Sequence, residues 1–513
     1  MASEYRYPTI GELWRFIFEC TGIWAFSENK GSLQTRLRRL ASEELFSLKS
    51  QADIEEEFRA LLNGLFNDEE LSSAVMTLID EVMMSYSAII ASYMAQYTKE
   101  ENIKYLLCCS GVGRLALSTC KQLAKLRRKN IPFGVSIDLF TPDFAADGAV
   151  VYPLSKMLSF LNNINLSNKS SVAKKHGETS ADSVRRYLNR LDKGYGKKNL
   201  ENLFEKLKPL LYFKENQEIE NYLKFLVFIA YTSEESYKKI DDKRFLSELV
   251  NEFVRQFQNI NSAMNETLFK MFSDKEIKQA SRDQWDDVVD RWASDAFDRL
   301  KNFIYYVSKD ITVDNIHYFR KLYSDENREG MVKNYELFGK DAVCFSEWYL
   351  TNHFDFPAPY DLIEADADLN DLNSLFRSKT DIDTYRKKVD LFKLKHKKTL
   401  ERYPWISEEL DSDIAYLEND FDRSKEHISR AFGLAKYSAG SGIVRIIARA
   451  FELSARCGDR ELFRQVYKWG KYTENIKIFG GADGCYKIYM GDGSFVIVTD
   501  NDAFEKVSEY YLD

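Results

Sequence analysis

Residues 211–260 read LYFKENQEIENYLKFLVFIAYTSEESYKKIDDKRFLSELVNEFVRQFQNI, with no glycine and no proline. They belong to a longer interval of the same kind: the chain has no glycine between Gly196 and Gly330 and no proline between Pro209 and Pro357. These two residue types are the strongest local markers of turns and sheet edges. The interval therefore predicts long helices joined by short polar turns, and it excludes a β-sandwich, a β-barrel and a disordered linker. The fold class that follows is mainly α and multi-helical.

The whole chain has 513 residues, which predicts about three domains at roughly 150 residues each. Its apolar fraction of 44% is enough for several cores. The longest apolar runs, such as 225–231, are far shorter than the roughly 18–20 residues that cross a bilayer, so no membrane segment is expected. The seven cysteines are scattered and form no C-x-x-C pair, which favours a reducing compartment and a cytoplasmic protein.

Five regions follow from the pattern. Residues 1–160 are an N-terminal helical region with a candidate α/β unit, 165–208 a basic block, 210–356 a helical body, 357–475 helical hairpins, and 476–513 a small β-hairpin followed by a helix. Pro357 and Pro359 mark the boundary before the hairpins. In the last region, 476–479, 486–490 and 495–499 are the expected strands, and Gly491-Asp492-Gly493 is the expected turn.

Two segments of the hairpin region are alike. Arg430-Ala-Phe-Gly-Leu-Ala435 matches Arg449-Ala-Phe-Glu-Leu-Ser454, and a turn of small residues follows each one. This pattern resembles a degenerate array of tetratricopeptide-like hairpins. A stable array needs at least three repeats and only two partial ones are visible, so an ordinary helical bundle remains the alternative.

Residues 103–141 predict a strand, a helix and a second strand. The apolar run 103–109 is the first, 115–129 has helical spacing, and Phe133, Val135, Ile137 and Leu139 alternate with polar or small residues. The loop between the first strand and the helix is Cys108-Cys-Ser-Gly-Val-Gly-Arg114, which resembles the phosphate loop of protein tyrosine phosphatases. That resemblance implies Cys108 as nucleophile and Arg114 as phosphate ligand, with Ser110, Gly111 and Gly113 lining the loop. It departs from the family pattern at Leu107 and Leu115, and a buried glycine turn is the alternative.

Positive charge is concentrated in 169–198. Nine basic and three acidic residues give this segment a net charge of +6, although the whole chain carries −8. A local basic segment is what nucleic-acid binding requires, whatever the total charge. A solvated basic hairpin that pairs with acidic surface elsewhere explains the same charge.

The order of residues in 171–191 resembles a helix-turn-helix. Ala173 and Gly177 occupy the small positions, Thr179 or Ser180 is an N-cap, and 181–191 carries an apolar face at helical spacing. The resemblance implies a second helix in the DNA major groove. The nucleic-acid contacts expected from it and from the flanking charge are Lys174, Lys175, Ser180, Arg185, Arg186, Asn189, Arg190, Lys193, Lys197 and Lys198. DNA is favoured over RNA as the partner.

Three functions therefore compete at the level of sequence. The first is a multi-helical protein that binds nucleic acid, with DNA favoured, through the helix-turn-helix-like basic block and has a regulatory or assembly role. The second is a non-catalytic scaffold or adaptor that contacts proteins, or a second copy of itself, through its helical hairpins or its C-terminal β-hairpin. The third is a phosphate-binding or phosphatase-like site at Cys108–Arg114.

The five histidines have no partner at i+4 and no cysteine pair nearby, so neither a metal nor another cofactor is expected. Arg423-x-x-x-His427 is similar to the arginine–histidine pair of helical ribonucleases, which use a wider spacing.

Overall fold

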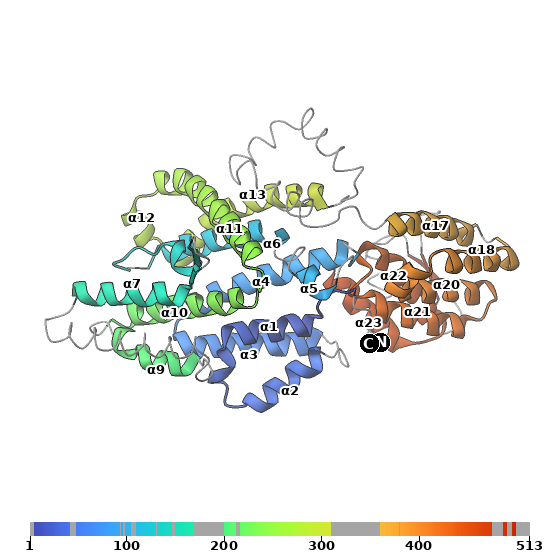
Figure 1. Ribbon diagram of the computed structural model, residues 1–513, viewed down its shortest axis with the longest axis horizontal. Helices are drawn as coiled ribbons and strands as arrows, with labels where there is room; N and C mark the ends of the chain where they lie inside the picture. Colours follow the sequence, from blue (N-terminus) through green and yellow to red (C-terminus); the bar gives the residue numbers. More distant parts are fainter. Residues whose placement is uncertain are drawn as a thin grey trace.

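The protein is mainly α and multi-helical in the computed structural model (Figure 1). The structure describes residues 5–41, 48–92, 94–95, 98–103, 109–129, 131–145, 149–168, 200–211, 216–308, 360–378, 380–473, 486–489 and 495–498. Its N-terminal helices are α1 (Ile10–Thr21), α2 (Lys30–Ala41), α3 (Leu48–Phe66), α4 (Glu69–Ser92), α5 (Lys99–Glu101), α6 (Cys109–Leu126), α7 (Pro153–Asn168) and α9 (Leu200–Leu211).

Apart from the cap residue Asn216 and short connections at 239–242, 272–273 and 280–281, the glycine- and proline-free interval is helical wherever the structure describes it. It contains α10 (Gln217–Lys238), α11 (Lys243–Met264), α12 (Asp274–Gln279) and α13 (Arg282–Ser308), with a short π-helix at Asn265–Phe269. Side chains cap the first two helices: Asn216 accepts from the Ile219 N–H, and Asp242 accepts from the Phe245 N–H. The expectation of long helices is confirmed for 216–308, and 309–359 lie outside the described residues.

The N-terminal helices share one buried core. Thr9 and Glu12 form a capping box at the start of α1, and Trp14 and Phe18 from that helix pack against Phe58 of α3. Gly11 lies directly against the end of α2. A Cβ placed on it would come within 2.1 Å of the Leu40 carbonyl carbon, so only glycine fits this crossing.

The predicted strand–helix–strand unit differs from the structure in its helix and its second strand, and residues 104–108 of its predicted first strand lie outside the described residues. Helix α6 begins at Cys109, six residues before the predicted start, and the predicted second strand is replaced by irregular backbone and a 3₁₀ helix at Ile137–Phe140. Phe133 packs on Phe160 of α7 and on Tyr222 of α10, with ring centroids 5.7 and 6.3 Å apart. The alternating apolar residues are thus covered at least in part by helices rather than by a sheet, with Ile137 buried and the other three partly buried. The strands nearby, β1 (Asp143–Phe144) and β2 (Val150–Val151), are two residues each and antiparallel.

The C-terminal hairpins are α17 (Tyr360–Arg377), α18 (Ile382–Lys395), α19 (Lys397–Arg402), α20 (Pro404–Leu417), α21 (Phe421–Ala435), α22 (Ile443–Arg456) and α23 (Arg460–Tyr472). Helices α20 to α23 each pack on the next along the chain, as expected of hairpins with short connections. The two similar segments lie in α21 and α22. Gly440 and Gly458 in the following turns have positive φ, +53° and +67°, a conformation that favours glycine.

The C-terminal β-hairpin is confirmed for the last two of its three predicted strands. β3 (Tyr486–Tyr489) pairs antiparallel with β4 (Phe495–Val498), with Tyr486 opposite Val498, and β3 lies beside α22. The predicted strand at 476–479, the turn at 491–493 and the final helix lie outside the described residues.

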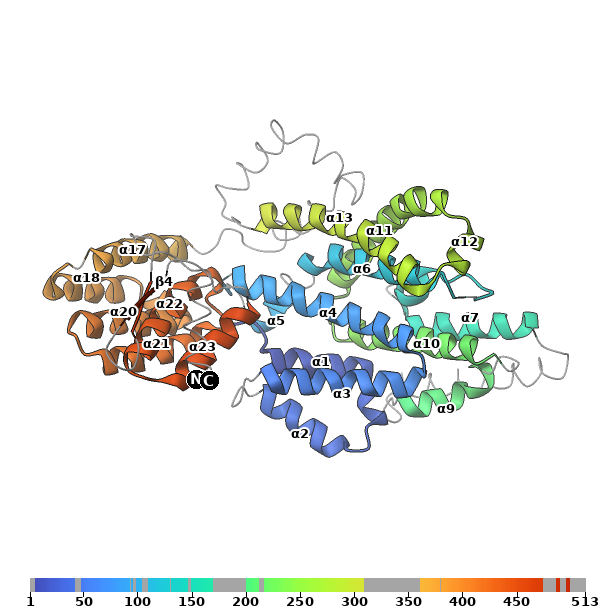
Figure 2. The same ribbon diagram turned by 180° about the vertical axis from the view of Figure 1, so that it is seen from behind.

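The two ends of the molecule are joined through α4 and the segments beside it (Figures 1 and 2). The Tyr7 N–H donates to the Tyr437 carbonyl at 2.8 Å, and the Ala95 N–H donates to the Ser438 carbonyl at 2.9 Å. The Tyr403 hydroxyl also donates to the Ala95 carbonyl at 3.0 Å. These bonds fix the hairpins to the N-terminal helices. In the described part of the chain, no helix combines the length and the apolar character needed to cross a membrane.

Candidate interaction surface

The predicted nucleic-acid interface lies outside the described residues. Helix α7 ends at Asn168 and α9 begins at Leu200, and all ten of the predicted contacts fall between them. The helix-turn-helix therefore stays a prediction.

The predicted phosphate loop is only partly described, because Cys108 lies outside the described residues. Ser110, Gly111, Gly113 and Arg114 lie within α6, so the backbone from Cys109 onward is helix and not the expected loop. Arg114 interacts electrostatically with Glu81 of α4. Burial lowers the pKa of Arg114, and the Glu81 charge opposes that shift. The Glu81 carboxylate thus partly neutralises the charge of Arg114 within the fold.

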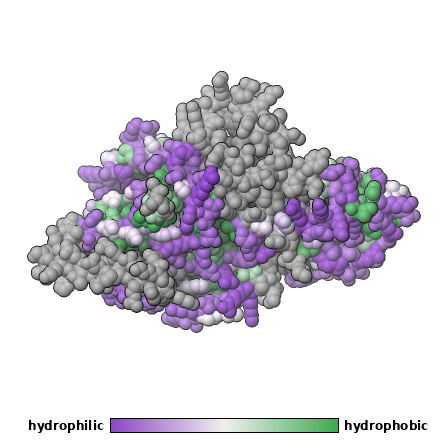
Figure 3. Space-filling model, viewed as in Figure 1, coloured by the Kyte–Doolittle hydropathy of each residue, from purple (hydrophilic) through white to green (hydrophobic). Residues whose placement is uncertain are grey.

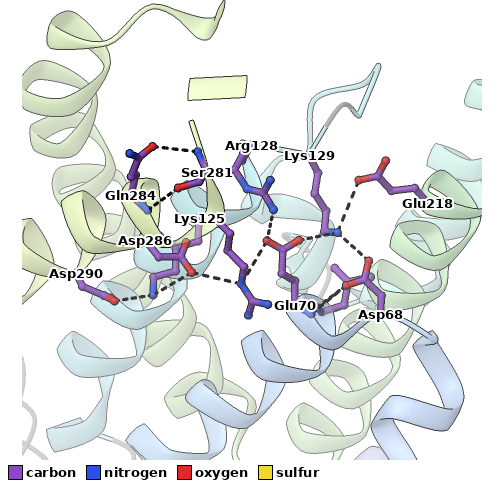
Figure 4. A network of polar contacts seen from close by, with 12 residues as sticks. Asp68, Glu70, Lys125, Arg128, Lys129, Glu218, Ser281, Gln284, Asp286 and Asp290 are labelled. Carbon is purple, nitrogen blue, oxygen red and sulfur yellow. Dashed lines mark hydrogen bonds and ion pairs between the residues drawn. The ribbon is translucent and has the colours of Figure 1, made fainter. Parts of the chain in front are cut away.

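A network of ion pairs surrounds the C-terminal end of α6 (Figure 4). The Lys129 Nζ lies 2.7 Å from Asp68 Oδ2 and 2.8 Å from Glu70 Oε2. Arg128 also pairs with Glu70 at 2.6 Å. Burial acts to raise the pKa of Glu70, but its bonds to Lys129 and Arg128 lower it overall. Cations at a helix C-terminus are favourable, and here they join α6 to the start of α4.

The same network continues to α13 on its other side (Figure 4). Lys121 and Lys125 both lie 2.8 Å from carboxylate oxygens of Asp290. Acidic side chains of the neighbouring helices pair with the basic side chains of α6. The network therefore holds these helices together and is poorly suited to bind an anionic ligand.

A second basic segment lies in the C-terminal hairpins. Residues 386–402 contain eight basic and two acidic residues, a net charge of +6 in little more than half the length of 169–198. Sequence reasoning missed this segment, although the same charge count applied along the whole chain finds it. The segment spans most of α18 and all of α19.

The inner face of α18 is firmly packed. Tyr385, Val389 and Phe392 are buried against the neighbouring hairpins. The Tyr385 hydroxyl donates to Asp413 Oδ2 at 3.1 Å. At the end of the helix, the buried His396 ring lies 2.7 Å from Asp368 Oδ2. This packing determines which side chains of α18 face solvent.

Several of the basic side chains in this segment have partners within the fold. Lys393 pairs with Asp411 of α20 at 2.7 Å, and Lys395 pairs with Glu364 and Asp368 of α17 at 2.9 and 2.8 Å. Arg386 pairs with Glu418, and the Arg402 guanidinium lies 4.6 Å from the centre of the Tyr5 ring. These contacts hold α18 and α19 to their neighbours.

Apart from the paired Lys395, the exposed residues of this segment are four lysines, two leucines, Asp390 and Glu401. Leu391 is 64% exposed and Leu394 is 79% exposed, and they follow Lys387 at the i+4 and i+7 positions of one helical face. Lys388 follows Lys387 on the helix, and Lys397 and Lys398 begin α19, which follows α18 after a break at His396. All four of these lysines are exposed, and none forms an ion pair with a residue that the structure describes. We call these four lysines and two leucines the α18 surface. Figure 3 shows hydrophobic surface among hydrophilic surface at the end of the molecule that α18 occupies.

A buried charged network lies behind the α18 surface. The Arg449 guanidinium lies against the rings of both Phe376 and Tyr416, 4.1 and 4.4 Å from their centres. It also lies 3.5 Å from Asp413 Oδ1. Burial raises the pKa of Asp413 to about 7, although the nearby Arg449 charge opposes that rise. Because Asp413 also accepts from Tyr385, the network connects α22 through α20 to α18.

Arg423 and His427 do not act as a pair. His427 Nδ1 lies 2.7 Å from Glu408 Oε2, which also accepts from Arg430 Nε at 3.0 Å. Arg423 instead pairs with Glu418. Partial burial acts to raise the pKa of Glu408, and the bonds from His427 and Arg430 lower it overall. Within the described part of the chain, no group of three histidine, cysteine or acidic side chains is placed to hold a metal ion.

Three comparisons with known proteins gave no relative. No protein-family model matches the chain, no curated protein matches it, and no solved structure matches its fold.

Proposed function

We propose that this chain is a non-catalytic scaffold or adaptor that binds a partner protein through its C-terminal hairpins. The observation that supports this proposal is the pair of exposed leucines on α18. Leu391 and Leu394 lie next to each other on one helical face, and the buried inner face holds that helix in place. Exposed apolar side chains grouped on a rigid element are typical of protein interfaces.

The rigidity of the hairpins supports the same proposal. The Arg456 guanidinium lies 3.2 Å from the centre of the Phe421 ring, which adds a second arginine–aromatic contact to that of Arg449. Backbone hydrogen bonds at Tyr437 and Ser438 fix the hairpins to the N-terminal helices. A surface on such a unit is already ordered before a partner binds, which reduces the entropic cost of association.

The test compares the full chain with Leu391→Ser/Leu394→Ser in quantitative affinity purification from the source cells. The control variant is Met271→Ser, whose side chain is 69% exposed and lies outside the hairpins. We expect the double variant to lose at least one protein that the wild type and the control both retain. Retention of every protein by the double variant would refute this function.

The second candidate function is nucleic-acid binding through 169–198. Its support is the local charge of +6 and the resemblance of 171–191 to a helix-turn-helix. We expect Arg185→Ala/Arg186→Ala to abolish a mobility shift of duplex DNA at moderate salt, while Lys270→Ala/Lys275→Ala leaves it unchanged. An unchanged shift with the arginine variant would remove this candidate.

A further inference from the structure

We propose that the α18 surface binds an acidic segment of the partner protein, one that carries apolar side chains between its carboxylates. This inference rests on the proposed scaffold function and specifies the chemistry of the partner. The two leucines of this surface supply an apolar contact, and its four lysines supply the charge. Neither part alone explains the arrangement.

The lysines have no ion-pair partner within the described fold. Lys393 and Lys395, on the same helix, lie within 3 Å of carboxylates of α20 and α17. Lys388, Lys397 and Lys398 are exposed and form no ion pair with any described residue. Lys387 has only a through-space effect, which helps to lower the pKa of Asp381 after the larger effect of the hydrogen bonds from Thr384. Two exposed acids of the same segment, Asp390 and Glu401, oppose these four lysines, so the exposed groups carry a net charge of +2. An acidic segment is the electrostatic complement of this net positive charge.

The leucines favour a protein segment over a nucleic acid. Phosphate contacts use lysine and arginine, while the bases of single strands stack on aromatic side chains. The exposed apolar side chains of the α18 surface are leucines, which provide neither an aromatic stacking face nor a hydrogen-bond donor. An apolar side chain of a partner helix would cover them and remove apolar area from water.

The same geometry disfavours a lipid surface. A helix that lies in a membrane interface buries a broad apolar face in the headgroup region. In α18 the broad apolar face is already occupied, because Tyr385, Val389 and Phe392 are buried within the hairpins. Only Leu391 and Leu394 face outward, and two leucines provide too little area for stable interfacial binding.

The test measures fluorescence anisotropy of labelled probes with the full-length chain. The main probe is a short peptide of alternating glutamate and leucine, and the comparison probes are polyglutamate, duplex DNA and vesicles that contain phosphatidylserine. We expect the wild type to bind the glutamate–leucine peptide more tightly than any comparison probe, with affinity that falls as salt rises. Equal affinity for polyglutamate would overturn the role of the leucines. If DNA or vesicles bind more tightly than the peptide, and the surface variants lose that binding, the ligand of the α18 surface is DNA or lipid and the proposed acidic segment is wrong.

Three variants separate the two parts of the surface. Leu391→Ser/Leu394→Ser should weaken peptide binding by about tenfold or more, since it removes the buried apolar contact. Lys387→Glu/Lys388→Glu should weaken it by a similar factor of about ten and reduce its salt dependence. The control Lys270→Glu/Lys275→Glu makes the same charge change at exposed lysines outside the hairpins and should leave binding unchanged. Circular dichroism confirms that each variant is folded, and unchanged binding by both surface variants would overturn the proposal.

Binding of the partner found by affinity purification tests the acidic segment and the scaffold function separately. If that partner is lost with the leucine variant but retained with Lys387→Glu/Lys388→Glu, the scaffold function stands and the acidic segment is wrong. If it is retained with both variants, the scaffold function at this surface fails as well.

Discussion

Replacing Asp413 with asparagine should remove one pH-dependent contribution to the stability of the C-terminal hairpins. Asp413 is buried, accepts a hydrogen bond from Tyr385 and lies beside Arg449. Burial raises its pKa from 3.8 to about 7. The native protein therefore retains a proton on Asp413 over a range of pH in which the unfolded chain has lost it.

The sign follows from this difference in bound protons. Between about pH 4 and pH 7 the native state binds one more proton than the unfolded state, so the free energy of unfolding decreases as pH rises. Each unit of pKa difference corresponds to about 1.4 kcal/mol, which gives about 4 kcal/mol over the whole interval. Asparagine has no proton to lose, and its amide oxygen still accepts from Tyr385. The variant should therefore become more stable relative to wild type as pH rises, by up to about 4 kcal/mol.

Urea unfolding of both proteins at several pH values between about 4 and 8 measures this effect. The relevant quantity is the difference in free energy of unfolding between variant and wild type, because titrations common to both proteins cancel. We expect this difference to rise with pH and to level off above about pH 7. A difference that is independent of pH, or that falls as pH rises, would refute the assignment of a protonated Asp413 in the native state.

Two further predictions concern the N-terminal helices. Lys129→Met should lower the free energy of unfolding by about 3–5 kcal/mol, because it leaves Asp68 and Glu70 without their most buried ion-pair partner. The control Lys275→Met replaces an exposed lysine and should change the free energy of unfolding by less than about 0.5 kcal/mol. Urea unfolding measures both values. Gly11→Ala should lower the free energy of unfolding by at least about 3 kcal/mol, because the added Cβ clashes with the backbone of Leu40. In the matched variant Gly64→Ala the added Cβ meets nothing within 4 Å, so it should stabilise α3 by about 0.5–1 kcal/mol. Melting temperatures that shift in the same direction for both variants would contradict this prediction.

The fold of the central helices could be predicted from the sequence because the relevant signal is local. Asn216 and Asp242 cap α10 and α11, and the absence of glycine and proline leaves nothing inside these helices to interrupt them. The error at 133–139 has a non-local cause. Alternating apolar residues fit a strand or a loop packed on helices equally well, and Phe160 and Tyr222, far along the chain, decide between them.

The sequence pattern predicts the start of α6 too late, at residue 115, for a related reason. Gly111 and Gly113 suggest a loop, yet both lie in the helix, where a glycine costs only about 1 kcal/mol. Packing of α6 on α4, α11 and α13 exceeds that cost. The resemblance to a phosphate loop depended on this boundary.

The α18 surface could be predicted only in part. A charge count finds the basic segment, but it does not tell Lys393 from Lys397. The first has a partner, Asp411, that only the tertiary fold brings to it, and the second has none among the described residues. The exposure of Leu391 has the same origin, because helical spacing alone does not show which apolar side chains become buried.

Lysine footprinting tests the central claim most directly. The full-length chain is treated with an amine-reactive label, alone and with the glutamate–leucine peptide bound, and the modified lysines are read by mass spectrometry. We expect Lys387, Lys388, Lys397 and Lys398 to lose reactivity when the peptide binds, while Lys270 and Lys275 keep theirs. Unchanged reactivity of the four lysines in the bound state would contradict the claim that the α18 surface is the binding site.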